Sequence, residues 1–129
     1  MSSESNAIVL QGTAGADLSA SQYLWVKADG TADEAIVLEN SPASRESVGI
    51  LKNAPGNGGD AWFTASGIAR GVAGAALEPY DEVTNDANGK TVVAAAGDLI
   101  RGRYIGRFDA VADDQIDILV YSNQNNALP

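Results

Sequence analysis

Histidine and cysteine, two side chains that often carry catalysis and metal binding, are absent from this sequence. Without them the chain lacks the commonest general base, the thiol nucleophile and the imidazole and thiolate ligands of transition metals. Its 17 acidic residues would allow a carboxylate pair for glycoside hydrolysis. No pair stands out beside aromatic residues, however, and two Trp and two Phe are few for a sugar-stacking cleft. We therefore expect a protein that is not an enzyme and uses no cofactor.

Two short segments have the composition of ligand-binding loops. Asp109, Asp113, Asp114 and Asp117 offer oxygen ligands of the kind that Ca²⁺ binds, but their spacing differs from an EF-hand loop. A solvated turn is the favoured interpretation, with a weak Ca²⁺ site as the alternative. Residues 56–60, GNGGD, are rich in glycine like a phosphate loop, yet neither a lysine nor a helix follows them. They predict a tight turn and no phosphate site.

Basic side chains gather at one place. Arg101, Arg103 and Arg107 are three of only eight basic residues and lie within seven positions. In residues 98–108 they occupy one parity of an extended chain, and apolar residues occupy the other, which predicts a strand. One interpretation is a solvated strand face. The other is a subunit or partner interface, where the planar guanidinium groups pair with carboxylates at two points.

The elements that would position these residues are short strands. Residues 80–121 read as a meander, and Asn88-Gly89 between two β-branched runs predicts a hairpin with a type I′ turn. Residues 115–121 form its last strand, with Asp117, Leu119 and Tyr121 on one side. Residues 73–77 have room for at most one short helical turn before Pro79.

The first half of the chain repeats the pattern of the second. When residues 23–51 are shifted by 57 positions without a gap, Tyr23 falls on Tyr80, Val26 on Val83 and Gly49 on Gly106. We interpret this as a possible internal repeat of one β-unit in a pseudo-symmetric domain. Two copies are too few for a solenoid, which needs at least three.

The N-terminal residues differ from the rest. Polar residues 1–6 precede an apolar segment, residues 7–10, and a Gly, Ala and Ser-rich stretch follows. This segment is either the first strand of the protein's own sheet or an arm that adds a strand to a partner. We predict an extended arm over residues 1–18, disordered at 2–11 in free solution, and a β-rich domain over residues 19–129. The contact residues of the arm would be Asn6, Ala7, Ile8, Val9, Leu10 and Gln11.

The predicted fold is mainly β: a small single-domain β-barrel or β-sandwich-like fold. Aromatic residues are 6% of the chain, so the core is light and self-association would stabilise it. A net charge of −9 argues against nucleic-acid binding. Apolar runs are too short to span a membrane, and the N-terminus lacks the basic region of a secretory signal. We expect a protein that works where it is made or is carried elsewhere by assembly.

Short glycine and turn motifs recur along the chain. In the first half they are the turn Asp29-Gly30-Thr31, the strand Val48-Gly49-Ile50-Leu51 and residues 62–70, WFTASGIAR. These resemble the head decoration proteins of lambdoid phages. In the second half, the segments 81–83, 88–90, 96–98, 105–106 and 115–120 are similar to the capsid cement proteins of tailed phages. The matches span residues 23–121 and consist of glycine and turn signatures in a shared order. Pro79-Tyr80-Asp81 and residues 70–78 depart from the pattern.

The resemblance implies a homotrimer that binds the major capsid protein on the outside of the phage head, after synthesis in the host cytoplasm. Its role would be to stabilise contacts between capsid subunits, with the N-terminal arm on the shell. The competing interpretation is a non-catalytic binding module that recognises a carbohydrate or receptor on a virion or cell surface. Such a module should work without residues 1–11, whereas a cement protein with this arm should not.

Overall fold

The computed structural model describes residues 7–29 and 35–129, and it contains strands and no helix over these ranges. No helix capable of crossing a membrane occurs in this described part. The segment 73–77, where one helical turn had been allowed, instead holds two isolated bridges, Ala73 to Thr91 and Leu77 to Ala110. The strands are β1 (Ile8–Ala14), β2 (Trp25–Ala28), β3 (Ala35–Leu38), β4 (Ser47–Leu51), β5 (Asp60–Val72), β6 (Glu82–Asn85), β7 (Thr91–Val93), β8 (Leu99–Ile100), β9 (Gly102–Tyr104), β10 (Gln115–Val120) and β11 (Asn126–Ala127).

The first half of the chain closes into a five-stranded barrel. Its strands follow one another in the order β1-β3-β2-β4-β5, and β1 also pairs with β5, which closes the ring. β1 is parallel to β3 and antiparallel to β5. Side chains that alternate along these strands fill the interior, as expected for a small barrel. The interior cluster consists of Ala14, Leu18, Val26, Ile36, Leu51, Ala61 and Phe63, with Val48 and Ala65 packed against it.

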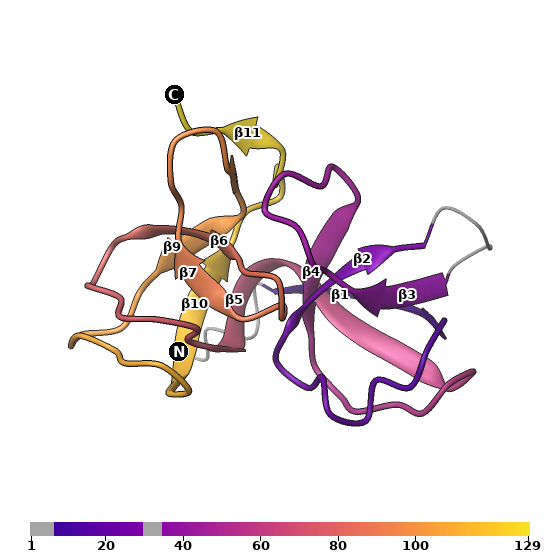
Figure 1. Cartoon of the computed structure of the whole chain (residues 1–129). Helices are drawn as coiled ribbons and strands as arrows, with labels where there is room; N and C mark the ends of the chain where they lie inside the picture. The colour runs from indigo at the N-terminus through magenta and orange to yellow at the C-terminus, as the bar shows by residue number, and fades with distance from the viewer. Residues whose placement is uncertain (1–6, 30–34) are drawn as a thin grey trace.

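The long strand β5 joins this barrel to a second unit. Residues 60–66 of β5 pair with β1, and residues 67–72 pair with β10. Gly67 lies between the two parts with φ of 98°, a conformation that glycine adopts without a Cβ clash. The second unit continues in the order β10-β9-β6-β7. Figure 1 shows β1 to β4 on one side of the molecule and β6, β7, β9 and β10 on the other.

A second hydrophobic cluster holds the two units together. Trp25 of β2 and Ile50 of β4 lie on the outer face of the barrel and are buried against the second unit. The Trp25 indole Nε1 donates a hydrogen bond of 2.9 Å to Oγ1 of Thr91 in β7. The neighbouring Val26 points into the barrel instead, so β2 is buried on both faces. Other members of this cluster are Ala69, Ala73, Leu77, Val83, Tyr104, Ala110, Ile116, Ile118 and Val120.

The internal repeat is present in the topology. The order β3-β2-β4-β5 in the barrel corresponds to β7-β6-β9-β10 in the second unit, with antiparallel pairing throughout. The ungapped alignment is wrong in its second part, however. Val26 lies opposite Gly49, and its counterpart Val83 lies opposite Gly102, not Gly106. A Cβ on Gly49 would collide with the carbonyl oxygen of Thr64, and one on Gly102 with that of Leu119, so both glycines allow a close approach of the next strand.

Each of the two repeats starts with a tyrosine that has positive φ. Tyr23 and Tyr80 have φ of 69° and 71°, and Asp113 is the other described non-glycine residue with positive φ. The Tyr23 amide donates to the carbonyl of Leu51, and the Tyr80 amide donates to that of Tyr104, 2.8 Å in both cases. Tyr23 lies two positions before β2 and Tyr80 two positions before β6, so the repeated left-handed turn directs the chain into these two strands in the same way.

The predicted Asn88-Gly89 hairpin is present between β6 and β7, but it does not have a type I′ turn. Gly89 has φ of 75°, while Asn88 does not have positive φ. The Asp86 carboxylate accepts hydrogen bonds from the amides of Asn88 and Lys90, and the Lys90 carbonyl accepts one from the Asp86 amide. This is a three-residue loop in which glycine takes the left-handed position after a turn. The longer loop lets the Gly89 carbonyl accept a hydrogen bond from the Trp25 amide.

Candidate interaction surface

Arg101 does not lie on an exposed strand face, contrary to both sequence interpretations. The predicted strand over residues 98–108 breaks at this residue into β8 and β9, and the Arg101 side chain is completely buried. It therefore cannot contact a partner or a second subunit. The break turns its guanidinium group into the interior, where it can reach acceptors on three parts of the chain.

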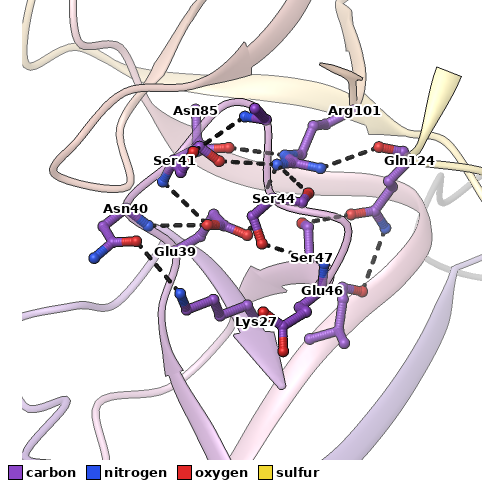
Figure 2. Close-up of polar contacts among 12 residues, drawn as sticks. Lys27, Glu39, Asn40, Ser41, Ser44, Glu46, Ser47, Asn85, Arg101 and Gln124 are labelled. Carbon is purple, nitrogen blue, oxygen red and sulfur yellow. Dashed lines mark hydrogen bonds and ion pairs between the residues drawn. The ribbon is translucent and has the colours of Figure 1, made fainter. Parts of the chain in front are cut away.

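Four hydrogen bonds hold the Arg101 guanidinium group (Figure 2). Its Nε donates to Oδ1 of Asn85 at 2.8 Å, and Nη1 donates to the carbonyl of Gln124 at 3.0 Å. Its Nη2 donates to the carbonyls of Ser41 and Ser44 at 3.0 and 2.9 Å. The acceptors come from the loop after β3, from β6 and from the segment before β11. Arg101 thus fixes the barrel, the second unit and the C-terminal segment relative to one another.

The buried carboxylate of Glu39 balances this charge. Its Oε2 lies 3.7 Å from Nη2 of Arg101, and both side chains are fully buried. The other oxygen, Oε1, accepts the amides of Asn40 and Ser41. Burial lowers the pKa of Arg101, although the carboxylates of Glu39 and Asp98 act in the opposite direction. An ordinary arginine pKa is so high that the group stays charged, so this is a structural ion pair.

Arg103 and Arg107 remain at the surface. Arg103 lies in β9 and is partly buried, and Arg107 is exposed in the loop that follows. The Arg103 Nε is buried without a hydrogen-bond partner. Neither residue lies within 4.0 Å of a carboxylate among the described residues. The three arginines therefore do not share one face, and Arg103 alone lies in the sheet face described below.

The apolar segment of the predicted N-terminal arm belongs to a strand of the barrel. Ile8–Ala14 is β1, paired with β5 from Ile8 to Thr13 and with β3 at its end. The boundary between an arm over residues 1–18 and a domain over 19–129 is therefore wrong, as is disorder throughout residues 2–11. Pairing on β5 satisfies the backbone of the apolar segment within the same chain. Asn6 and the residues before it lie outside the described part.

Exposed apolar side chains nevertheless remain on β1. Ile8 and Leu10 are 55% and 49% exposed, while Ala7 and Val9 are partly buried and Gln11 is exposed. Contact of these residues with a capsid stays a prediction.

The acidic segment 109–117 and the glycine-rich segment 56–60, which had the composition of ligand-binding loops, make local contacts within the fold. Asp114 accepts the Val111 amide, Asp113 forms an ion pair with Lys90, and Asp117 forms one with Arg70. Over residues 7–29 and 35–129, no group of three or more acidic residues is placed to hold a metal ion. In the glycine-rich turn, the Gly58 amide donates to the Ala14 carbonyl and the Ala14 amide to the Gly59 carbonyl, so this turn extends the β1 to β5 pairing.

A groove of about 260 Å³ lies where the barrel meets the second unit. Its walls combine apolar side chains with the two basic side chains of Lys52 and Arg70. The apolar part includes Val9 of β1 and Ile68 of β5, and the repeated tyrosine Tyr23 lies at its side. The remaining lining residues are Ala7, Ile50, Thr64 and Ala69.

The outer face of the second unit continues from this groove. Ile68 and Arg70, which line the groove, lie opposite Leu119 and Asp117 of β10. Leu119 in turn lies opposite Arg103 of β9. Directly opposite residues in an antiparallel pair project from the same side of the sheet. A row of side chains therefore leads from the groove to Arg103 and, through its pairing with β6, to Glu82. We call the groove and this row together the groove face.

The groove face carries basic groups without ion-pair partners. Arg70 pairs with Asp117 at 3.6 Å and donates to Gln115 at 3.0 Å. Lys52 is exposed, and no carboxylate lies within 4.0 Å of it in the described part of the chain. With Arg103, this places three of the eight basic residues of a chain with net charge −9 on one surface. Two acidic residues of the same surface, Asp117 and Glu82, stand against these three, so the groove face has a small excess of basic groups.

A second exposed apolar region lies in the loops at the far end of the second unit. Tyr80, Phe108 and Val111 are 70%, 77% and 62% exposed. The Tyr104 hydroxyl fixes this region by donating to the Phe108 carbonyl at 2.6 Å. Its sequence neighbourhood is mainly acidic, with Asp109, Asp113 and Asp114 close along the chain and one basic residue, Arg107, beside Phe108.

Sequence reasoning did not find the residues that make the groove face continuous. Lys52 belongs to no motif, and Ile68 was noted only as part of the motif of residues 62–70, without a role in binding. The alternation in residues 115–121 had placed Leu119 on the same side of its strand as Asp117, opposite the core residues, and this pattern predicted that Leu119 is exposed. The pairing of Leu119 with both Ile68 and Arg103 depends on the order of the strands, which is a property of the whole fold.

Comparison with known proteins gives one kind of match. No protein-family model matches the sequence, and no curated protein matches it. Among solved structures, the fold is similar to the N base of the head fiber protein gp8.5 of bacteriophage phi29. The superposition has a TM-score of 0.69 at 11% identity and covers 92% of this chain and 97% of that one. At this identity the likeness establishes a shared fold.

Proposed function

We propose that the chain is a structural protein of a tailed-phage virion that attaches to the outer surface of the capsid. The observation that carries this proposal is the length of the match to a phage head fiber base, which covers nearly all of both chains. Such coverage includes both the barrel and the second unit. A chance likeness to one barrel would not extend over the strands β6, β7, β9 and β10.

The motifs of phage decoration proteins support the same role from another direction. They span residues 23–121, and in the fold residues 48–51 and 62–70 lie in β4 and β5, while residues 115–120 form β10. Residues 30 and 31 of the first turn lie outside the described part. The lack of histidine and cysteine agrees with a role that needs no acid-base or thiol chemistry. In the proposed role the protein binds the major capsid protein and strengthens contacts between its subunits.

Self-association as a trimer belongs to this proposal. Two hydrophobic clusters form the interior, and both include alanine, whose side chain buries little apolar surface. Burial of further apolar surface between copies would add stability. Analytical ultracentrifugation at micromolar concentration should then show a trimer in solution or on release from shells, and a stable dimer would contradict this part of the proposal.

Co-sedimentation tests the capsid role directly. Empty shells of the phage that encodes the chain, prepared without this protein, are mixed with purified protein and pelleted. The proposal predicts saturable binding and greater resistance of the loaded shells to heat or chelation. Protein that stays in the supernatant at every concentration would refute it.

A further inference from the structure

Besides the exposed Ile8 and Leu10 of β1, two apolar regions of the surface are candidates for docking, and their charges differ. The loop region of Tyr80, Phe108 and Val111 has a sequence rich in Asp. The groove face has Lys52 and Arg103, neither of which has a carboxylate within 4.0 Å in residues 7–29 and 35–129. Charge complementarity therefore directs an acidic partner to the groove face, while the rest of a protein with net charge −9 repels it.

The shape of the groove face limits the kind of partner. The groove holds about 260 Å³ and is bounded by neighbouring strands, which is room for a few side chains and too little for a folded element. The row from Ile68 through Leu119 to Arg103 continues it across three adjacent strands. An extended peptide could place an apolar side chain in the groove and another over Leu119, with a carboxylate near each free cation.

We propose that the groove face receives an extended segment of the capsid protein that carries aliphatic side chains and carboxylates. This inference rests on the capsid role proposed above and adds the surface and the chemistry of the contact. Val9 and Ile68 contact the aliphatic side chains, and Lys52 and Arg103 pair with the carboxylates. Arg70 stays engaged with Asp117 and Gln115 and keeps the wall of the groove in place.

Two matched pairs of variants test this assignment in the co-sedimentation assay. Lys52→Glu reverses an exposed charge on the groove face, and Arg45→Glu reverses an exposed charge at the opposite end of β4. Leu119→Glu places a charge on the sheet face, and Phe108→Glu places one in the other apolar region, where the side chain is 77% exposed. All four positions are at least partly solvent-exposed, and melting curves confirm that each variant folds.

The proposal predicts that Lys52→Glu and Leu119→Glu each weaken binding to shells by about tenfold or more, as central contact residues do. Arg45→Glu and Phe108→Glu should bind like the unaltered protein. The defect of Lys52→Glu should shrink between about 0.05 M and about 0.5 M NaCl, because salt screens repulsion between exposed charges. A defect that does not change with salt would contradict the acidic character of the partner.

The outcomes separate this inference from the capsid role. If the unaltered protein binds shells and both groove-face variants bind equally well, the groove face is not the docking surface, while the capsid role stands. If those variants instead lose self-association and keep shell binding, a second copy of the chain occupies the groove face and the proposal is overturned. If the unaltered protein does not bind shells, the capsid role itself fails, and this inference fails with it.

Discussion

Replacing Arg101 with methionine tests whether the buried polar network holds the two units together. Methionine is similar in length and apolar, so it fills most of the space without the charge. The substitution removes four hydrogen bonds of 2.8 to 3.0 Å and the countercharge of Glu39 at 3.7 Å. The Glu39 carboxylate is then buried with two amide donors, those of Asn40 and Ser41, and no cation.

The expected loss of stability follows from the burial of the Glu39 carboxylate. Removing one partner of a buried ion pair destabilises a protein by about 3–5 kcal/mol, because the remaining charge is uncompensated. Full burial of both side chains means that solvent does not screen this pair. Domains of this size have total stabilities of about 5–15 kcal/mol. We therefore expect Arg101→Met to lose about a fifth or more of the free energy of unfolding and to lower the melting temperature by roughly 10–20 °C.

Urea denaturation followed by circular dichroism measures the change, with Arg107→Met as the control. Arg107 is exposed and unpaired in the described structure, so its substitution should change stability by about 0.5 kcal/mol or less. Arg101→Met combined with Glu39→Gln should be less destabilised than the sum of the two single variants, because the amide keeps an oxygen for Asn40 and Ser41 and carries no charge. A loss below about 1 kcal/mol for Arg101→Met, or strict additivity in the double variant, would refute the reasoning.

Three further predictions concern the fold. Gly49→Ala should destabilise the protein by about 3 kcal/mol in thermal unfolding, since its Cβ would collide with the Thr64 carbonyl; Gly56→Ala, with open space around the Cβ position, is the control, and equal effects would contradict the close approach. Burial, followed by the carboxylates of Asp114, Asp109 and Asp117, raises the pKa of Tyr104. The stability from this group is therefore complete below the unfolded pKa of about 10 and is lost as pH rises through the folded pKa. Tyr104→Phe should flatten the decline of the melting temperature at alkaline pH, and an unchanged decline would assign it to other groups. Deleting residues 2–11 should destabilise the protein by about 3 kcal/mol, because it removes half of β1 from the barrel; deleting residues 2–5 leaves β1 whole, and a melting temperature that neither deletion changes would contradict the pairing of β1.

Local patterns in the sequence were enough for the fold class and for most strands. Alternation in residues 115–121 and the turn residues around Gly89 predicted β10 and the β6 to β7 hairpin. The repeat of Tyr23 and Tyr80 was visible because both sites need the same left-handed turn before a strand. The gap in the repeat was not visible, because Gly106 matches Gly49 by residue type while Gly102 matches it by position in the sheet.

The burial of Arg101 could not be predicted from the sequence. Parity along a strand assumes that the strand is continuous, and this one breaks where the guanidinium group turns inward. Its hydrogen-bond acceptors lie 16 to 60 residues away along the chain, so no local sequence pattern predicts them. The prediction of an arm in place of β1 failed for a similar reason, since an apolar segment pairs equally well with its own sheet or with a partner.

Cryo-electron microscopy of the heads of the phage that encodes this chain, with and without the protein, tests the central claim most directly. The difference map should show density on the outer surface of the shell that fits the barrel and the second unit together. The groove face should be turned toward the capsid protein. Density confined to the tail or the interior of the head, or no difference between the two maps, would contradict the proposed function.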